Sequence, residues 1–202
     1  MNTTHSALLA IPILLALATP SLAADDPLVK ILPPKDDASV CFERSYGAAH
    51  LKRHPKQQTT RILLSFRYQG NDGIHIERIA LTRRGKAPPL YFAGGCEWSE
   101  RANRNTSGQR LLTFYPKNEG YACIALTAPG SAREGGFFLI DFPRDGKSAT
   151  LYFNSPIEAM ETADGRGFNG DVKLGRDDLV FWLRRTDASA CRALEEALPN
   201  LP

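Results

Sequence analysis

Two histidines and their neighbours offer the first chemistry to consider in this sequence. His50 and His54 stand four residues apart in a segment predicted to be a short helix, so both rings would project from one face. The intervening residues 51–53 lack the glutamate of a metalloprotease motif, and their two cations would repel a dication. A third ligand could come only from His75 or Glu77, which alternate onto one face of a predicted strand. We therefore interpret the histidines as surface or capping residues and predict no metal site.

Catalytic motifs are absent from the sequence. No Gly-x-Ser-x-Gly elbow, no Ser-x-x-Lys pair and no Cys–His arrangement occurs, and neither does a phosphate loop or a dinucleotide fingerprint. We predict no cofactor. A glycan hydrolase would need two carboxylates facing each other across a cleft roughly 5–10 Å wide. The carboxylate pairs that could supply them are Glu97 with Glu100, Glu158 with Glu161, and Asp177 with Asp178. Such pairs arise by chance in charged loops, so the sequence favours a protein without catalytic activity over an enzyme.

The first 23 residues have the pattern of an export signal. Residues 7–18 are almost wholly apolar, Pro20 follows, and residues 21–23 are small enough for a signal peptidase. The apolar run is too short to span a bilayer, and no later run approaches the roughly twenty apolar residues of a membrane helix. We predict cleavage near Ala23, a periplasmic or secreted location, and no membrane span.

All four cysteines, Cys41, Cys96, Cys123 and Cys191, follow the predicted export signal. An even number of cysteines in an oxidising compartment predicts two disulfides, and three pairings are open. We favour Cys96 with Cys123, which closes a local loop, and Cys41 with Cys191, which joins the two ends of the domain. No two cysteines are spaced closely enough for a cysteine-based metal site.

The charge of the chain is only mildly basic. It has 25 Lys and Arg against 22 Asp and Glu, a net of +3, which falls short of the dense basic face of a nucleic-acid-binding protein. Basic residues nevertheless cluster at residues 52–56, 83–86 and 184–185. These clusters form either a solvated rim of loops or a contact for an anionic envelope component, such as a phosphorylated lipid or an acidic glycan. Arginine suits that contact because its fork matches phosphate and carboxylate geometry.

The pattern along the chain predicts one β-rich domain over residues 39–202, after an extended lead-in over residues 24–38 that contains Pro27, Pro33 and Pro34. Residues 61–68 alternate strictly between apolar and polar side chains, as a half-buried strand does, with Leu63 as the one exception. Further strands are expected at residues 41–42, 74–82, 90–93, 110–115, 121–127, 136–142, 149–154, 170–174 and 179–184. Ser45 could cap a short helix over residues 46–54, and Asp187 is a plausible N-cap for one terminal helix.

Two of the predicted strands, residues 137–142 and 179–183, are apolar on both faces. This pattern indicates that something also covers their outer surface. The terminal helix could cover one of them. Packing within the domain, a partner or an apolar ligand could cover the other.

An internal similarity at an offset of 61 residues aligns residues 79–92 with residues 140–153, and seven of these fourteen positions are identical. A duplicated meander would give about eight to nine strands. We predict a mainly β fold, a single antiparallel barrel or a two-sheet sandwich, with one C-terminal helix. If the similarity is a true duplication, Tyr91 and Tyr152 should be equivalent about a pseudo-twofold axis.

These observations favour an exported, non-catalytic binding module. Its ligand would be a small apolar molecule inside a barrel, or an envelope component bound by its loops. One alternative is an envelope glycan hydrolase that uses loop carboxylates such as Glu97 and Glu100. Another is an inhibitor of a secreted hydrolase that acts through the polar loop at residues 101–109.

Overall fold

The computed structural model describes residues 27–35, 38–69, 74–85, 87–126, 134–161 and 168–198. The predicted export signal lies outside these ranges. The described strands are β1 (Ser39–Ser45), β2 (Thr59–Gln69), β3 (Ile74–Arg83), β4 (Leu90–Ser99), β5 (Gly120–Leu126), β6 (Glu134–Asp141), β7 (Ser148–Phe153), β8 (Ile157–Met160), β9 (Phe168–Val172) and β10 (Val180–Thr186). The helices are η1 (Pro27–Lys30), α1 (Ala48–Arg53), η2 (Arg176–Asp178) and α2 (Ser189–Ala197).

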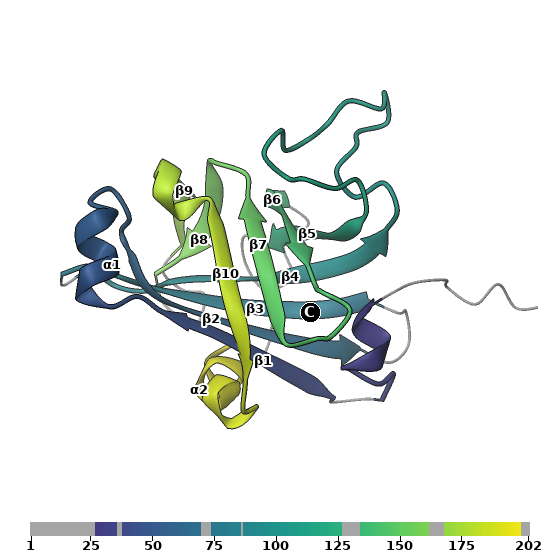
Figure 1. Cartoon of the computed structure of the whole chain (residues 1–202), viewed down its shortest axis with the longest axis horizontal. Coiled ribbons are helices and arrows are strands. Elements are labelled where there is room, and N and C mark those ends of the chain that lie inside the picture. Colours follow the sequence, from purple (N-terminus) through teal and green to yellow (C-terminus); the bar gives the residue numbers. More distant parts are fainter. Residues whose placement is uncertain are drawn as a thin grey trace, which may run out of the picture.

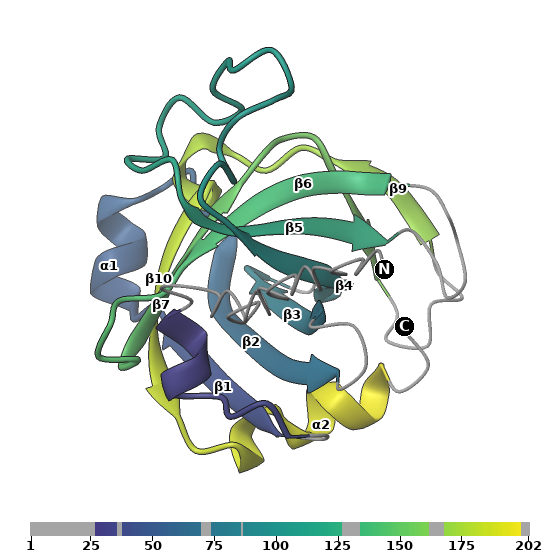
Figure 2. The same ribbon diagram turned by 90° about the vertical axis from the view of Figure 1, so that its right-hand side faces the viewer.

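Eight of the strands form a closed antiparallel barrel (Figures 1 and 2). The barrel is one of the two architectures, barrel or sandwich, that the sequence predicts. The order around the barrel is β3-β2-β1-β10-β7-β6-β5-β4, and the pairing of β3 with β4 closes the ring. Strands β8 and β9 extend from β4 through the pairing of Tyr91 with Met160. Closure leaves the barrel strands without free edges, which protects them from pairing with other chains.

Alternate side chains of each barrel strand fill the interior. On β2, Ile62, Leu64 and Phe66 point inward and are fully buried, in agreement with the alternation in the sequence. Phe66 packs edge-on against Tyr121 and Phe142, and Phe138 stacks on Phe153 in the same core. The interior is therefore a core packed with side chains.

The helix η1 lies within the segment predicted to be an extended lead-in. Its Leu28 is fully buried, and Leu32 just after it is also buried in the main core. The prediction of an extended lead-in over residues 24–38 is therefore wrong for this part, because the apolar side chains between the prolines gain burial by joining the core. The lead-in belongs partly to the folded body.

Both predicted disulfides are present. Cys96 on β4 bonds Cys123, its direct neighbour on β5, and Cys41 on β1 bonds Cys191 on α2. The second bond holds α2 against the outside of β1, β2 and β3, where Leu194 and Leu198 pack. Both bonds are expected only in an oxidising compartment. Within the described ranges, no helix has both the length and the apolar character needed to cross a bilayer.

The two α-helices begin close to the predicted positions. At α1 the N-cap residue is Gly47, and the Ser45 hydroxyl donates to Glu43 on its own strand, so the predicted Ser45 cap is wrong. At α2 the Asp187 carboxylate accepts the N–H of Ser189 at 2.8 Å. The N-cap position itself is Ala188, so the predicted Asp187 cap is one residue off. Hydrogen bonds from the Ser189 side chain, and then from its N–H, lower the pKa of Asp187.

Residues 110–115 form part of the β4–β5 loop and not the predicted strand. The pattern looks like a strand, but β5 already pairs with β4 on one side and β6 on the other, so the closed ring has no edge to accept it. Leu112 and Tyr115 instead pack down onto Leu139 of β6. This loop covers the outer face of residues 137–142, so the cover comes from within the domain. The prediction that the terminal helix covers one of the two strands that are apolar on both faces is wrong, because α2 packs on β1, β2 and β3.

The similar segments at residues 79–92 and 140–153 form the β3–β4 and β6–β7 hairpins, and each has a glycine with positive φ at the same position, Gly85 and Gly146. Their registers differ, since Ile79 pairs with Phe92 but Ile140 pairs with Leu151. The hairpins lie three strand positions apart and so run in opposite directions. A rotation by 180° that matched the strand directions of one hairpin to those of the other would also reverse the order of its two strands around the barrel. The predicted pseudo-twofold equivalence is therefore wrong.

Candidate binding face

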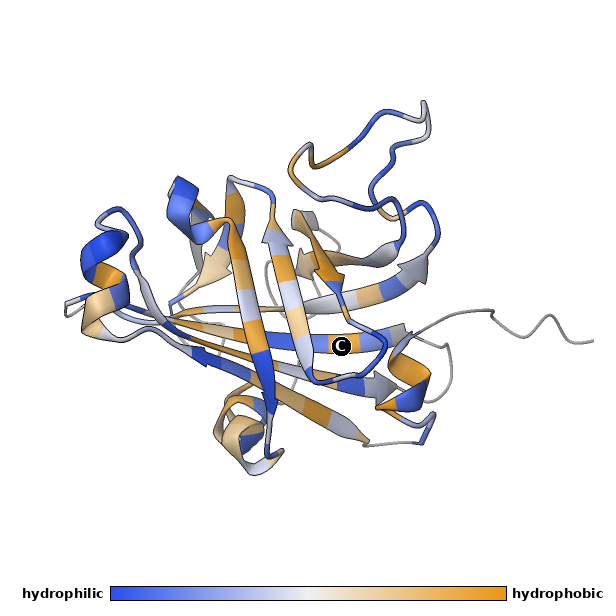
Figure 3. Cartoon of the chain, in the orientation of Figure 1, coloured by the Kyte–Doolittle hydropathy of each residue, from blue (hydrophilic) through white to orange (hydrophobic). Residues whose placement is uncertain are grey.

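The outer side of β10 is an apolar strand face that the rest of the described chain leaves uncovered. Phe181 and Leu183 point into the core, whereas Val180 and Trp182 point outward and are each 44% exposed. The helix α2 covers β2 and β3, and the β4–β5 loop covers β6. The predicted cover for residues 179–183 is therefore not supplied by the part of the chain that the structure describes. Figure 3 shows the apolar residues along β10.

Two arginines lie against Trp182. The guanidinium carbon of Arg44 on β1 is 5.5 Å from the centre of the Trp182 ring, and that of Arg184 is 5.2 Å away. Arg44 is also 5.5 Å from the ring of Tyr46. Cation–π contacts of this kind hold a guanidinium group in place while leaving its N–H edge open to an anion. We call Arg44, Tyr46, Trp182 and Arg184 the arginine–tryptophan face.

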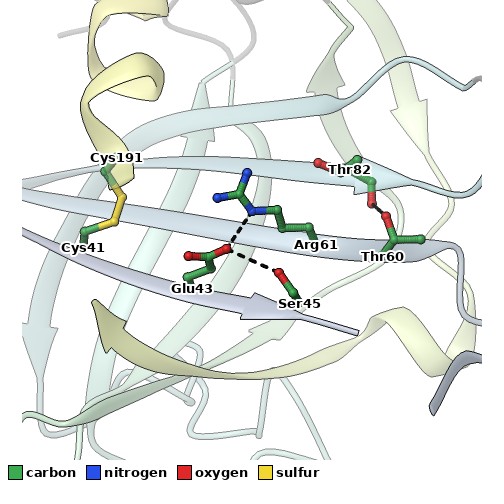
Figure 4. Close-up of polar contacts among 7 residues, drawn as sticks. All are labelled: Cys41, Glu43, Ser45, Thr60, Arg61, Thr82 and Cys191. Atoms are coloured by element: carbon green, nitrogen blue, oxygen red, sulfur yellow. Dashed lines mark hydrogen bonds and ion pairs between the residues drawn. A yellow bond between two sulfur atoms is a disulfide. The ribbon is translucent and has the colours of Figure 1, made fainter. Parts of the chain in front are cut away.

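The positive charge of this face is not neutralised by neighbouring acids. Neither Arg44 nor Arg184 has an acidic partner in the described ranges. Glu43 lies opposite Arg184 in the strand ladder, but its carboxylate accepts from Arg61 Nε at 2.7 Å and from the Ser45 hydroxyl at 3.3 Å. Figure 4 shows Glu43 between these two donors, on the strand that carries Cys41. Both arginines of the face are therefore available to an external anion.

Of the other predicted basic clusters, the one at residues 52–56 is exposed, whereas both described arginines of the cluster at residues 83–86 have partners within the fold. Arg84 donates to the carbonyl oxygens of Leu51 and His54 and so caps the end of α1, while Arg83 pairs with Glu161 at 3.1 Å. Lys86 lies outside the described residues. Among the predicted clusters, the one at residues 184–185 alone lies beside an exposed aromatic ring in the described structure.

The three histidines that the structure describes do not meet in a metal-ligating group. The His50 and His54 rings stack at 4.3 Å, and Nε2 of His50 lies 3.0 Å from the side-chain oxygen of Gln57. His75 is buried and packs against Phe66 and Tyr121, not against His50 or His54. No group of three metal-ligating side chains occurs among the residues that the structure places.

The predicted carboxylate pairs have separate roles. Asp178 is buried and accepts the N–H groups of Gln58 and Thr59, which joins η2 to the start of β2. Glu161 is bound to Arg83. Glu97 and Glu100 are both exposed, on β4 and in the turn after it. A pair of carboxylates that cooperate in glycoside hydrolysis face each other across a cleft, whereas the structure shows these two only as exposed groups.

Glu77 is the unexpected polar group inside the barrel. It is fully buried, and its Oε1 atom has no hydrogen-bond partner. Its Oε2 atom lies 3.3 Å from Sγ of Cys96, and because a disulfide sulfur carries no proton, this contact is a hydrogen bond only when the carboxyl is protonated. Burial raises the pKa of Glu77 well above 4.5. A side chain on Gly94 would collide with Ile124 and Glu77, so this strand position requires glycine.

The polar loop at residues 101–109 is held in one shape by its own hydrogen bonds. The Asn103 side chain is buried and bonds both the N–H and the carbonyl of Leu112, at 2.7 and 3.0 Å. Arg104 donates to the carbonyl of Gly108 and to the Asn118 side chain. This hydrogen-bonded loop projects from the end of the barrel (Figures 1 and 2).

The fold and this face define a disulfide-bonded, closed eight-stranded β-barrel with two extra strands, a short C-terminal helix and a cationic aromatic outer face. No protein-family model, curated protein or solved structure matches the chain, and its function is inferred from its own residues. The sequence pattern locates Arg184 but misses Trp182 and Arg44. Alternation along β10 places Trp182 and Arg184 on one side, whereas the contact of Trp182 with Arg44 depends on how β1 and β10 meet.

Proposed function

We propose that this chain is an exported, non-catalytic binding module that recognises an anionic component of the cell envelope through the arginine–tryptophan face. The observation that carries the proposal is the pair of arginines without acidic partners in the described structure, both held against the exposed ring of Trp182. Ring contacts reduce the conformational entropy that each long side chain loses on binding. Phosphate and carboxylate groups are the ligands that such guanidinium groups bind best.

The packed interior favours an outer ligand over a small apolar molecule inside the barrel. Side chains such as Phe66, Phe138 and Phe153 occupy the centre, and Leu28 of η1 adds to the same core. A ligand inside would have to displace these rings, each of which contributes several kcal/mol of stability. Binding at the outer face requires no such rearrangement.

Binding of two defined polyanions tests the proposal. Wild-type protein should bind phosphatidylglycerol vesicles or polygalacturonate, and binding should weaken with salt because exposed charges are screened. Each arginine near an anionic surface contributes about 1 kcal/mol, so the double variant Arg44→Gln with Arg184→Gln should bind about 30-fold more weakly. The matched control, Arg53→Gln with Arg192→Gln, removes the same charge from exposed positions on α1 and α2 outside the face.

Equal weakening by both double variants would show that net charge alone causes binding, and this would refute the proposed face. The hydrolase alternative is separated by Glu97→Gln and Glu100→Gln, which should leave binding unchanged. If these two variants instead abolished turnover of an envelope glycan, the protein would be an enzyme.

The ordered loop at residues 101–109 favours a second candidate, inhibition of a secreted hydrolase. Its internal hydrogen bonds fix its shape before any partner binds, which reduces the entropy lost on association. Replacing residues 104–109 by two glycines should abolish inhibition of a purified muramidase while leaving polyanion binding intact. If the wild-type protein does not slow the muramidase, this candidate loses its support.

A further inference from the structure

Three of the large exposed apolar side chains in the described structure, Phe114, Val180 and Trp182, gather on one side of the barrel. Val180 and Trp182 follow each other on the outside of β10, and Val180 is the ladder partner of Tyr152 on β7. Phe114 in the β4–β5 loop is 43% exposed, and its ring centre lies 6.5 Å from that of Tyr152. These four residues form an apolar stripe that runs from the loop across β7 to β10. Large contiguous apolar patches on a protein surface mark interaction sites.

The stripe ends at the two arginines of the arginine–tryptophan face. Trp182 belongs to both, and the guanidinium carbons of Arg44 and Arg184 lie 5.5 and 5.2 Å from its ring centre. The two guanidinium carbons are therefore at most 10.7 Å apart, the sum of these distances. An acid close to the other end of the stripe, Asp141, is paired with Lys117 at 2.8 Å. The surface thus combines exposed rings and aliphatic groups with two cations that lack acidic partners in the described ranges.

We propose that this stripe docks the protein onto the surface of an anionic phospholipid bilayer, with Phe114, Val180 and Trp182 entering the headgroup region and Arg44 and Arg184 contacting lipid phosphates. This inference rests on the proposed function and names the source of the anion. An acidic polysaccharide would use the arginines but would leave the aliphatic and phenyl groups of the stripe in water. A bilayer uses both, because interfacial binding grows with buried apolar area and with attraction to anionic lipids.

The aromatic residues of the stripe suit the depth of the headgroups. Tryptophan and tyrosine have an apolar ring and one polar group, and they gather at the membrane interface for that reason. Trp182 also reports on its own surroundings. The chain has two tryptophans, and Trp98→Phe leaves Trp182 as the sole fluorophore.

Sedimentation with vesicles tests the inference. Vesicles of phosphatidylcholine with phosphatidylglycerol should bind the protein at least tenfold more tightly than vesicles of phosphatidylcholine alone. The double variant Phe114→Ser with Val180→Ser should lose about tenfold in affinity for the anionic vesicles and keep its affinity for polygalacturonate. Val29→Ser, which changes an exposed apolar residue of η1 away from the stripe, should bind like the wild type. In the Trp98→Phe protein, lipids brominated near the headgroup should quench Trp182.

Three results would overturn the inference, and they differ in what they mean for the proposed function. Binding of polygalacturonate that depends on Arg44 and Arg184, without vesicle binding, would leave the proposed function intact and exclude the bilayer as the anion's source. If the double variant Phe114→Ser with Val180→Ser bound the anionic vesicles as tightly as the wild type, charge alone would account for the attraction. Failure of both polyanions to bind would refute the proposed function together with this inference. Unchanged circular dichroism and melting of the surface variants would exclude misfolding as the cause.

Discussion

Replacing Glu77 by glutamine should change how the stability of the barrel depends on pH. Glu77 is fully buried, its Oε1 atom has no hydrogen-bond partner, and its neighbour Arg78 points away and donates to the carbonyl of Leu198. Burial raises the pKa of Glu77 well above 4.5 in the folded protein. In the unfolded chain the carboxyl returns to a pKa of about 4.5. The two states therefore bind this proton differently over the pH range between the two values.

The direction and size of the effect follow from proton linkage. Below pH 4.5 Glu77 is protonated in both states, so this residue adds no pH dependence. Above that value the unfolded chain releases the proton while the folded protein keeps it, and unfolding becomes more favourable. The free energy of unfolding should fall by about 1.4 kcal/mol for each pH unit until the pH passes the folded-state pKa. Glutamine has the same size and no titration, so Glu77→Gln should remove this slope.

Urea unfolding between pH 5 and pH 7, without reductant, measures the prediction. The difference in free energy of unfolding between the wild type and Glu77→Gln should shift in favour of the variant as the pH rises from 5, by up to about 1.4 kcal/mol for each pH unit. Glu97→Gln is the matched control, because Glu97 is exposed on the neighbouring strand β4, and it should follow the wild type. Parallel curves for the wild type and Glu77→Gln would refute the reasoning, since they would mean that the buried carboxyl is solvated or has a partner.

The remaining predictions concern stability. Replacing Cys41 and Cys191 by alanine should lower the free energy of unfolding by about 5 kcal/mol, because the bond closes a loop of 150 residues; urea titration under oxidising conditions measures this, and a loss under 1 kcal/mol would contradict it. Asp178→Ala should cost about 2–4 kcal/mol, because it removes the acceptor of two backbone N–H groups; an unchanged melting temperature would refute that role. Asn103→Ala should speed hydrogen exchange of the Leu112 amide without altering the barrel amides; equal exchange in both proteins would show that the loop is held by other contacts.

Much of the fold could be predicted because strands and disulfides leave local signals. The alternation of Ile62, Leu64 and Phe66 correctly predicts their inward direction, since successive side chains of a strand point to opposite faces. The cysteine pairing was also predicted, from compartment and chain position. The pairing of β3 with β4 closes the ring and excludes the sandwich. The sequence could not decide between barrel and sandwich, because that decision depends on pairing between distant strands, which the alternation of side chains does not encode.

The errors have a common physical origin in tertiary competition. Residues 110–115 carry a strand pattern, but both edges of β5 are already paired, so the segment folds as a loop over Leu139. Leu28 lies among prolines and joins the core because it gains burial there. The binding face could be predicted only in part. The sequence places apolar groups on both sides of residues 179–183. Trp182 stays exposed because neither the β4–β5 loop nor α2 extends over it, and the sequence pattern does not encode how far these two elements extend.

Chemical-shift mapping with soluble short-chain phosphatidylglycerol tests the central claim most directly, because it locates the ligand on the folded protein. We predict that the largest shifts occur at Arg44, Trp182 and Arg184, including the indole N–H, and that residues of the barrel interior such as Phe66 stay unchanged. Shifts centred on the interior, or none at any residue at saturating lipid, would contradict recognition through the outer face.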